Sequence, residues 1–287
     1  MERPRIAAVA YLNALPLIWG LSRGARIGYS DLALLPPHEC AQRLEEGFAD
    51  IALIPSVEFA RIAGLIPVPG LGISSRREVR SVLLVSKCPP ASIKSLAVDL
   101  NSRTSVALSR LVLARRYGAR PRLEVMPPSL GPMLERHDAA LLIGDAALSA
   151  GPSDGEPGPD GRGLHVLDLA REWNLMTGLP FVFAFWACRP VVPLLDLQPI
   201  LEESLKEGMS QIDRIAAEES ARTCLPVELI TTYLRQNIHY TLGPAESDSL
   251  RVFYRMCREN DLLRGPASRE QATEPIQIAG RPEAPRP

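Results

Sequence analysis

Hydroxyl groups gather in residues 99–105, Asp-Leu-Asn-Ser-Arg-Thr-Ser, which join an apolar run to a strongly amphipathic segment. Three of these side chains belong to Ser102, Thr104 and Ser105. Free backbone N–H groups at a helix N-terminus, with hydroxyl donors beside them, suit a carboxylate or a phosphate. The alternative is that Ser102 or Thr104 is a simple N-cap. The segment therefore predicts either an anion site or a capped helix.

A phenol and an amide follow the first apolar run of the chain. Tyr11 and Asn13 come directly after the run at 6–10. An asparagine offers a ligand both a donor and an acceptor, although it can also close a turn or cap the next helix. Asn13 is therefore a candidate ligand contact, with the structural role as its alternative.

Two serines stand at positions that a ligand could reach. Ser81 lies in the apolar run 79–86, and its side chain points either into a cleft or into solvent because strand residues alternate. Ser56 begins the helical pattern 56–64, where it can bind a ligand or cap the helix.

Three further candidates lie in the second half of the chain. Asp145 comes after a glycine that ends the run at 139–144, and it can orient a donor or cap the next segment. Thr177 and Gly178 lead into the long apolar run 181–189 and are expected to complete a cleft.

Several classes of active site are excluded by what the sequence lacks. There is no GxSxG, HExxH, P-loop or GxGxxG motif. The four histidines are far apart: His38, His137, His165 and His239. The five cysteines are scattered without CxxC spacing, which is typical of reduced thiols rather than of a disulfide framework or a zinc site. An enzyme of this sequence must therefore work with hydroxyls, amides and backbone dipoles.

Strands and helices alternate along the first two thirds of the chain, which predicts an α/β fold with sheets flanked by helices. The predicted strands are 6–10, 50–55, 79–86, 96–100, 122–127, 139–144 and 181–189. The predicted helices are 36–47, 56–64, 104–118, 193–221, 226–237 and 246–261.

This order indicates two lobes with a ligand cleft between them. The first lobe is expected to be discontinuous, formed by 1–84 and 186–264, and the second is inserted as 85–185. The strands 79–86 and 181–189 would form the hinge. Residues 151–163 are rich in Gly, Pro and Asp and predict a surface loop, and 265–287 predicts a disordered tail.

Composition is that of an ordinary globular protein, with 46% apolar residues and a net charge of −1 from 32 basic and 33 acidic residues. This balance favours no nucleic-acid partner and no membrane surface. The N-terminal apolar stretch is interrupted by Asn13 and Pro16, unlike a signal peptide, so a cytoplasmic location is expected. The oligomeric state is left open.

Six segments, in this order, resemble the menaquinone-biosynthesis dehydratases that act on chorismate. They are AYLNALPL, GFADIALIP, RSVLLVS, DLNSRTSVAL, ALLIGDAAL and TGLPFVFAFWA, and the match runs from about residue 5 to 262. Ala10 and Ala14 depart from the family, in which hydroxyl residues are common at these places. The resemblance implies the type II periplasmic-binding-protein fold, with two sheets joined by a two-strand hinge.

The resemblance also implies the reaction, which is dehydration of chorismate to 3-[(1-carboxyvinyl)oxy]benzoate in the futalosine route, without a metal or an organic cofactor. Asn13 and Ser81 would then be catalytic and would position the ring and its leaving hydroxyl. The other expected substrate contacts are Tyr11, Ser56, Ser102, Thr104, Ser105, Asp145, Thr177 and Gly178. The base would be the enolpyruvyl carboxylate of the substrate or Asp145.

Two alternatives share the expected fold. A solute-binding protein would have the same cleft but should carry an export signal. The sister enzyme, 1,4-dihydroxy-6-naphthoate synthase, has a proline- and asparagine-rich first loop with a cysteine, where this sequence has Tyr11-Leu12-Asn13.

Overall fold

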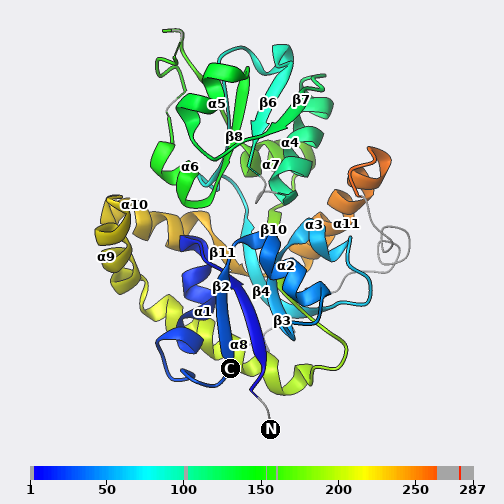
Figure 1. Ribbon diagram of the computed structural model, residues 1–287, viewed down its shortest axis with the longest axis vertical. Helices are drawn as coiled ribbons and strands as arrows, with labels where there is room; N and C mark the ends of the chain where they lie inside the picture. Colours follow the sequence, from blue (N-terminus) through cyan, green and yellow to red (C-terminus); the bar gives the residue numbers. More distant parts are fainter. Residues whose placement is uncertain (1–2, 100–102, 153, 160, 264–277, 279–287) are drawn as a thin grey trace.

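The computed structural model describes residues 3–99, 103–152, 154–159, 161–263 and 278. Its strands form two separate sheets (Figure 1). The first has six strands in the order β11-β4-β10-β3-β1-β2. These strands are β1 (Arg5–Val9), β2 (Asp31–Leu35), β3 (Ile51–Pro55), β4 (Ile66–Ser75), β10 (Phe181–Cys188) and β11 (His239–Thr241). Strand β1 runs parallel to β2 and β3, whereas β10 is antiparallel to β3 and β4.

The second sheet has five strands in the order β7-β6-β8-β5-β9. They are β5 (Val82–Ser86), β6 (Ser95–Val98), β7 (Arg122–Val125), β8 (Ala139–Ile143) and β9 (His165–Asp168). Strand β6 is parallel to β7 and β8, and β5 is antiparallel to β8 and β9. Strands β3, β5 and β8 are buried along their whole length, as continuous apolar runs in a sheet covered on both faces should be.

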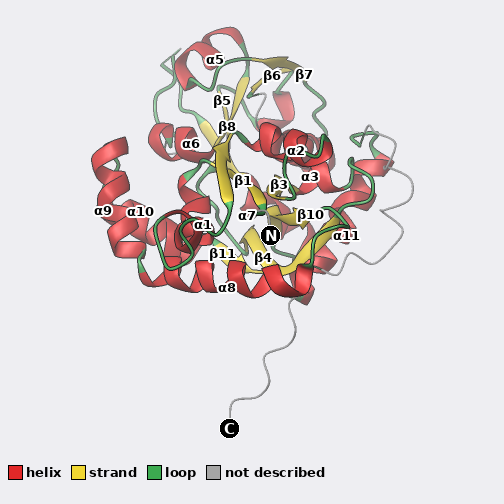
Figure 2. Cartoon of the chain, turned by 60° about the horizontal axis from the view of Figure 1, so that its bottom comes forward, coloured by secondary structure: helices red, strands yellow, loops and turns green. Residues whose placement is uncertain are grey.

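Helices cover both sheets (Figures 1 and 2). Those that follow strands of the first sheet or come after β10 are α1 (Leu15–Ser22), α2 (Pro37–Glu45), α3 (Ser56–Phe59), α8 (Leu194–Ser210), α9 (Ile212–Thr223), α10 (Val227–Thr232) and α11 (Pro244–Glu259). Those in the chain of the second sheet are α4 (Arg103–Arg116), α5 (Leu130–Arg136), α6 (Gly144–Ala150) and α7 (Leu169–Thr177). Three short turns are η1 (Leu12–Ala14), η2 (Pro90–Ser92) and the π-helical η3 (Tyr233–Asn237). None of the described helices is long and apolar enough to cross a membrane.

We call the part built on the six-stranded sheet the first lobe and the part built on the five-stranded sheet the second lobe. The chain crosses between them at 76–81 and at 178–180. The predicted boundaries after 84 and 185 fall inside β5 and β10. Each of these strands belongs to one sheet only, so neither is shared by the lobes. We therefore propose lobe boundaries at the two crossings.

The first crossing interrupts the apolar run 79–86 for a local reason. Arg80 has a φ of 61°, in the left-handed region, where a strand cannot continue. The backbone N–H groups of Val79 and Arg80 donate to Asp168 Oδ2 at 2.9 and 2.7 Å rather than to a neighbouring strand. Asp168 Oδ1 caps α7, so one carboxylate fixes both the crossing and the helix.

Several predicted elements have different lengths in the structure. The predicted helix 193–221 is two helices, because Gln211 leaves helical geometry between α8 and α9. The helix predicted at 56–64 ends at Phe59. Of the predicted tail 265–287 only Ile278 is described, and it is buried, with its carbonyl accepting a hydrogen bond from Gly70 N at 2.7 Å. The loop 151–163 is mostly exposed in its described part.

An aromatic cluster joins the lobes beside the second crossing. The Trp173 ring of α7 contacts Phe181 of β10 and Phe253 of α11 edge-on, with centroids 5.3 and 5.9 Å apart. Trp173 Nε1 donates to Ser249 Oγ at 3.0 Å. These rings are buried, so the lobes share a continuous apolar core on this side.

Candidate active site

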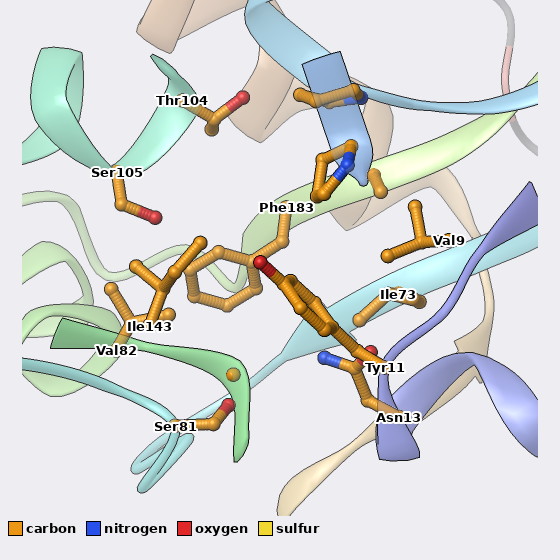
Figure 3. A pocket seen from close by; sticks show the side chains of 14 residues that line it. Val9, Tyr11, Asn13, Ile73, Ser81, Val82, Thr104, Ser105, Ile143 and Phe183 are labelled. Atoms are coloured by element: carbon orange, nitrogen blue, oxygen red, sulfur yellow. The ribbon is translucent and has the colours of Figure 1, made fainter. Parts of the chain in front are cut away.

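A cavity lies between the two lobes (Figure 3). Fourteen described residues line it: Val9, Tyr11, Asn13, Pro37, Pro55, Ile73, Ser81, Val82, Thr104, Ser105, Ile143, Gly144, Phe183 and Ala184. Most lie at or just after the ends of β1, β3 and β8 or begin α4 and α6. Ligands of open α/β sheets bind at such strand ends, so the sequence of elements explains why these residues converge.

None of these fourteen residues carries a charged side chain, and most are apolar. The polar groups are the hydroxyls of four residues and one amide. The cavity can therefore hold a small, flat, largely apolar ring and fix it with a few hydrogen bonds. In the described part of the chain, no group of His, Cys, Asp and Glu is arranged to hold a metal ion.

Tyr11 reaches into the cavity from the turn after β1, and its hydroxyl end points toward the centre of the labelled side chains (Figure 3). Its ring packs on Gly144, where an added Cβ would lie 3.1 Å from Cδ2 of Tyr11. Gly144 also has a φ of 58°, which disfavours any other residue. Burial, with Asp99 and Asp145 nearby, raises the pKa of Tyr11 above its ordinary range, so its hydroxyl remains protonated.

Asn13 lies in η1, and Ser81 lies at the first crossing. The Oδ1 atom of Asn13 is buried and has no hydrogen-bond partner within the described structure. A buried carbonyl without a partner is costly, so this atom is suited to accept a hydrogen bond from a ligand. Ser81 is 1% exposed and receives a hydrogen bond from the hydroxyl of Tyr233 at 2.8 Å. Its backbone carbonyl accepts from Gly144 N at 2.8 Å.

The N-terminus of α4 supplies the hydroxyls on the second-lobe side. Ser105 is nearly buried, and its hydroxyl turns toward the cavity (Figure 3). Thr104 Oγ1 accepts a hydrogen bond from Val57 N of the first lobe at 3.1 Å, and its own hydroxyl proton remains for a ligand. Ser102, the third predicted hydroxyl, lies outside the described residues. Arg103 binds the buried carboxylate of Glu58 at 2.9 Å and does not line the cavity.

Asp145 lies just outside the cavity and joins the lobes. Its Oδ1 accepts from Leu12 N at 3.1 Å, and its Oδ2 lies 3.3 Å from the Arg222 guanidinium of α9. Burial is the largest influence on this carboxyl and raises its pKa, while the hydrogen bond from Leu12 and the charge of Arg222 oppose that rise. The geometry thus makes Asp145 a support for the turn that carries Asn13.

Three other predicted contacts, Ser56, Thr177 and Gly178, do not line this cavity. Ser56 is fully buried and donates to the carbonyl of Val182 at 2.8 Å, because its helix starts against β10. The Thr177 hydroxyl donates to the Trp173 carbonyl of its own helix at 2.9 Å. Gly178 ends α7 with a φ of 73°. Both Thr177 and Gly178 act at the helix end instead of in the cleft.

The structure also brings in residues that the sequence did not single out. Phe183, Ile73 and Ile143 form apolar walls, and Tyr233 lies behind Ser81. Phe183 and Ile143 lie in predicted strands that indicated only a core, and Ile73 lies in β4, where no strand was predicted. Phe183 is only partly buried, whereas the other residues of β10 are buried.

Comparisons with known proteins identify the family of the chain and agree with its fold. A family model described as menaquinone biosynthesis matches residues 4–259. A chorismate dehydratase of Thermus thermophilus is 31% identical over 260 residues, which cover 83% of this chain and 94% of that protein. A chorismate dehydratase of Campylobacter jejuni is 26% identical over 213 residues, or 74% of this chain and 77% of that protein.

Two solved structures show the same fold at low sequence identity. A protein from Archaeoglobus fulgidus aligns with a TM-score of 0.70 and 16% identity, covering 91% of this chain and 98% of that one. The periplasmic aliphatic sulphonate binding protein of Escherichia coli aligns with a TM-score of 0.63 and 17% identity, covering 100% and 96%. The two-lobed, periplasmic-binding-protein-like fold expected from the sequence is confirmed.

Proposed function

Because the chain belongs to the menaquinone biosynthesis family, we propose that it dehydrates chorismate to 3-[(1-carboxyvinyl)oxy]benzoate, the first step of the futalosine route. The alignment with a chorismate dehydratase over 83% of the chain carries this conclusion. The uncharged cavity between the lobes supports it, because its apolar walls suit a ring that becomes aromatic.

The reaction requires little covalent chemistry from the protein. The C3–H bond of the ring breaks, and its electron pair forms the C3–C4 double bond as the C4–O bond breaks. The departing hydroxide takes up the proton, so the products are an aromatic ring and one water. Since aromatisation drives the reaction, the protein must mainly orient the substrate, stabilise developing charge and exclude water.

We propose that a substrate carboxylate binds at the N-terminus of α4. The helix dipole and its first N–H groups favour an anion there, and the hydroxyls of Thr104 and Ser105 add donors. No charged side chain of the lining competes for this carboxylate.

Asn13 and Ser81 are proposed to act on the leaving hydroxyl. The unpartnered Oδ1 of Asn13 can accept the hydrogen of the C4 hydroxyl and hold it in place. Ser81 Oγ already accepts a hydrogen bond, so its own proton is available to the oxygen that leaves. Tyr11 would close the same side of the ring.

We propose the enolpyruvyl carboxylate of the substrate as the base that takes the C3 proton. The alternative, Asp145, is occupied by Leu12 N and Arg222 and does not line the cavity. A base must reach its proton within hydrogen-bond distance, and the substrate carboxylate is tethered next to C3 by the ether oxygen.

Incubation of the purified protein with chorismate tests this function. Mass spectrometry should show a product lighter by one water, with the ultraviolet spectrum of a substituted benzoate. Asn13→Ala should lower kcat far more than it raises KM, because Asn13 serves the reacting geometry. Tight retention of another solute without turnover would favour a binding protein, and conversion of a later pathway intermediate instead of chorismate would favour the naphthoate synthase.

A further inference from the structure

A buried tyrosine stands directly behind the cavity. Tyr233 is 1% exposed and begins the π-helical turn η3, and its hydroxyl donates to Ser81 Oγ at 2.8 Å. Tyr233 does not itself line the cavity. It comes from the helices after β10, 152 residues away in sequence from Ser81 at the first crossing.

The direction of this hydrogen bond determines what Ser81 can offer a substrate. A serine hydroxyl has one proton and two lone pairs. Because Ser81 Oγ accepts from Tyr233, its own proton is left to point into the cavity. With the Tyr233 hydroxyl as the donor, the phenol proton points to Ser81.

The π-helical turn holds the crossing at two points. Tyr233 at its start binds Ser81, and the Nδ2 atom of Asn237 at its end donates to the Glu78 carbonyl at 3.0 Å. Wide helical turns of this kind occur often at functional sites. Here the turn fixes residues 78–81 between the lobes.

We propose that Tyr233 is a positioning residue for the dehydration, which orients and polarises the Ser81 hydroxyl as a donor to the leaving oxygen. This inference rests on the proposed function. A hydrogen bond received by a hydroxyl strengthens the one it donates, so loss of the phenol weakens the Ser81 donor without removing it. Burial raises the pKa of Tyr233, which keeps the phenol protonated.

The test compares two buried tyrosines that each donate a hydrogen bond, one beside the cavity and one away from it. Tyr233→Phe removes the hydroxyl and retains the ring. Tyr254→Phe is the matched control, because Tyr254 is also 1% exposed and donates one hydrogen bond, to the Ser56 carbonyl at 2.6 Å, outside the cavity. We expect Tyr233→Phe to lower kcat by about 10-fold or more and to leave KM within about threefold of the wild-type value. This fall in kcat corresponds to the loss of one well-aligned hydrogen bond in the transition state. Tyr254→Phe should lower the melting temperature similarly but leave kcat within about twofold.

A second comparison uses Ser81→Ala with and without Tyr233→Phe. Because Tyr233 acts through Ser81, the double variant should have the kcat of Ser81→Ala within about threefold. This pair leaves neither buried partner unmatched, so it serves even if Tyr233→Phe alone folds poorly. The inference is overturned if Tyr233→Phe has the kcat of Tyr254→Phe. It is also overturned if Tyr233→Phe lowers kcat by the same factor in the Ser81→Ala background as in the wild type. A wild-type protein that does not turn over chorismate would overturn the proposed function itself.

Discussion

Gly144 decides where the Tyr11 ring lies, and it illustrates how one residue shapes the cavity. It combines a left-handed backbone with a contact too close for a side chain. Replacing it therefore displaces either the backbone at the start of α6 or the tyrosine that faces the ring of the substrate.

We expect Gly144→Ala to cost about 1–2 kcal/mol of stability, because alanine is strained in the left-handed backbone conformation of this residue. We also expect it to lower kcat/KM by about 10-fold, because the added Cβ would displace the Tyr11 ring. Thermal denaturation and steady-state kinetics measure both. Gly131→Ala is the control, since Gly131 lies in a helix with open space around it and should be neutral or slightly stabilised. Equal behaviour of the two variants would contradict the close packing of Tyr11.

A substitution of Asp145 distinguishes the two candidate bases, the substrate carboxylate and Asp145 itself. Asp145→Asn keeps an oxygen for Leu12 N but removes the charge. If the substrate supplies the base, kcat should stay within about fivefold of wild type, because the residue only supports the turn of Asn13. A fall of about 1,000-fold in kcat, measured at saturating substrate, would instead identify Asp145 as the base.

The uncharged lining predicts a flat pH dependence near neutrality. The hydroxyls of Tyr11 and Tyr233 have pKa values raised by burial, so they lose their protons only above the ordinary tyrosine value of about 10. Between about pH 7 and about pH 9, kcat should therefore change by less than about twofold. A steep limb in this window would show that a titrating side chain takes part in the reaction.

At the scale of elements, α4 joins the lobes through its first turn. Thr104 accepts the N–H of Val57 at the start of α3, and Arg103 binds Glu58 one residue further along. The same turn supplies the proposed carboxylate site, so substrate binding and lobe contact are linked there.

Thr104→Val should remove the acceptor for Val57 N while retaining shape. An unpaired buried N–H costs about 1–3 kcal/mol, and we expect a lower melting temperature together with a KM raised about 10-fold. Ser109→Ala in the same helix is the control, because the Ser109 hydroxyl bonds only to the Val106 carbonyl one turn before it. A Thr104→Val protein with the melting temperature and KM of Ser109→Ala would show that this contact is unimportant.

Sequence patterns anticipated the elements unevenly. Continuous apolar runs such as 139–144 were correctly assigned as strands, because burial on both faces leaves a clear signal. Strand β4 was missed, since its sequence IPVPGLGISS contains prolines and glycines that disfavour strands and its pairing with β10 is irregular. Helix faces could not be oriented from the sequence, so the role of Tyr233 could not be predicted although its helix was expected.

The candidate site was anticipated where it depends on element ends. Asn13, Ser81, Thr104 and Ser105 all line one cavity. Asn13, Thr104 and Ser105 come after the carboxyl ends of parallel strands, whereas Ser81 precedes β5, which is antiparallel and starts beside the carboxyl end of β8. Their chemical roles stay predictions. Thr177 and Gly178 end α7 and do not line this cavity, and a helix end uses the same hydroxyl and glycine signals as a ligand site.

At the scale of the molecule, the lobes meet on both sides of the cavity. The aromatic cluster around Trp173 and the Asp168 carboxylate hold the crossings, while Asp145 and Thr104 bridge the cavity rim. These rim contacts are polar, whereas the crossings are held by a buried aromatic cluster as well as by the Asp168 hydrogen bonds. We therefore expect opening, when substrate enters, to break the rim contacts and to pivot near the crossings.

The most direct measurement is a crystal structure of Asn13→Ala protein soaked with chorismate. We expect density for the intact substrate in the cavity between Tyr11, Ser81 and Ser105, with a carboxylate at the N-terminus of α4. Well-defined substrate bound at another surface, with this cavity empty, would contradict the proposal that the uncharged cavity between the lobes performs the dehydration.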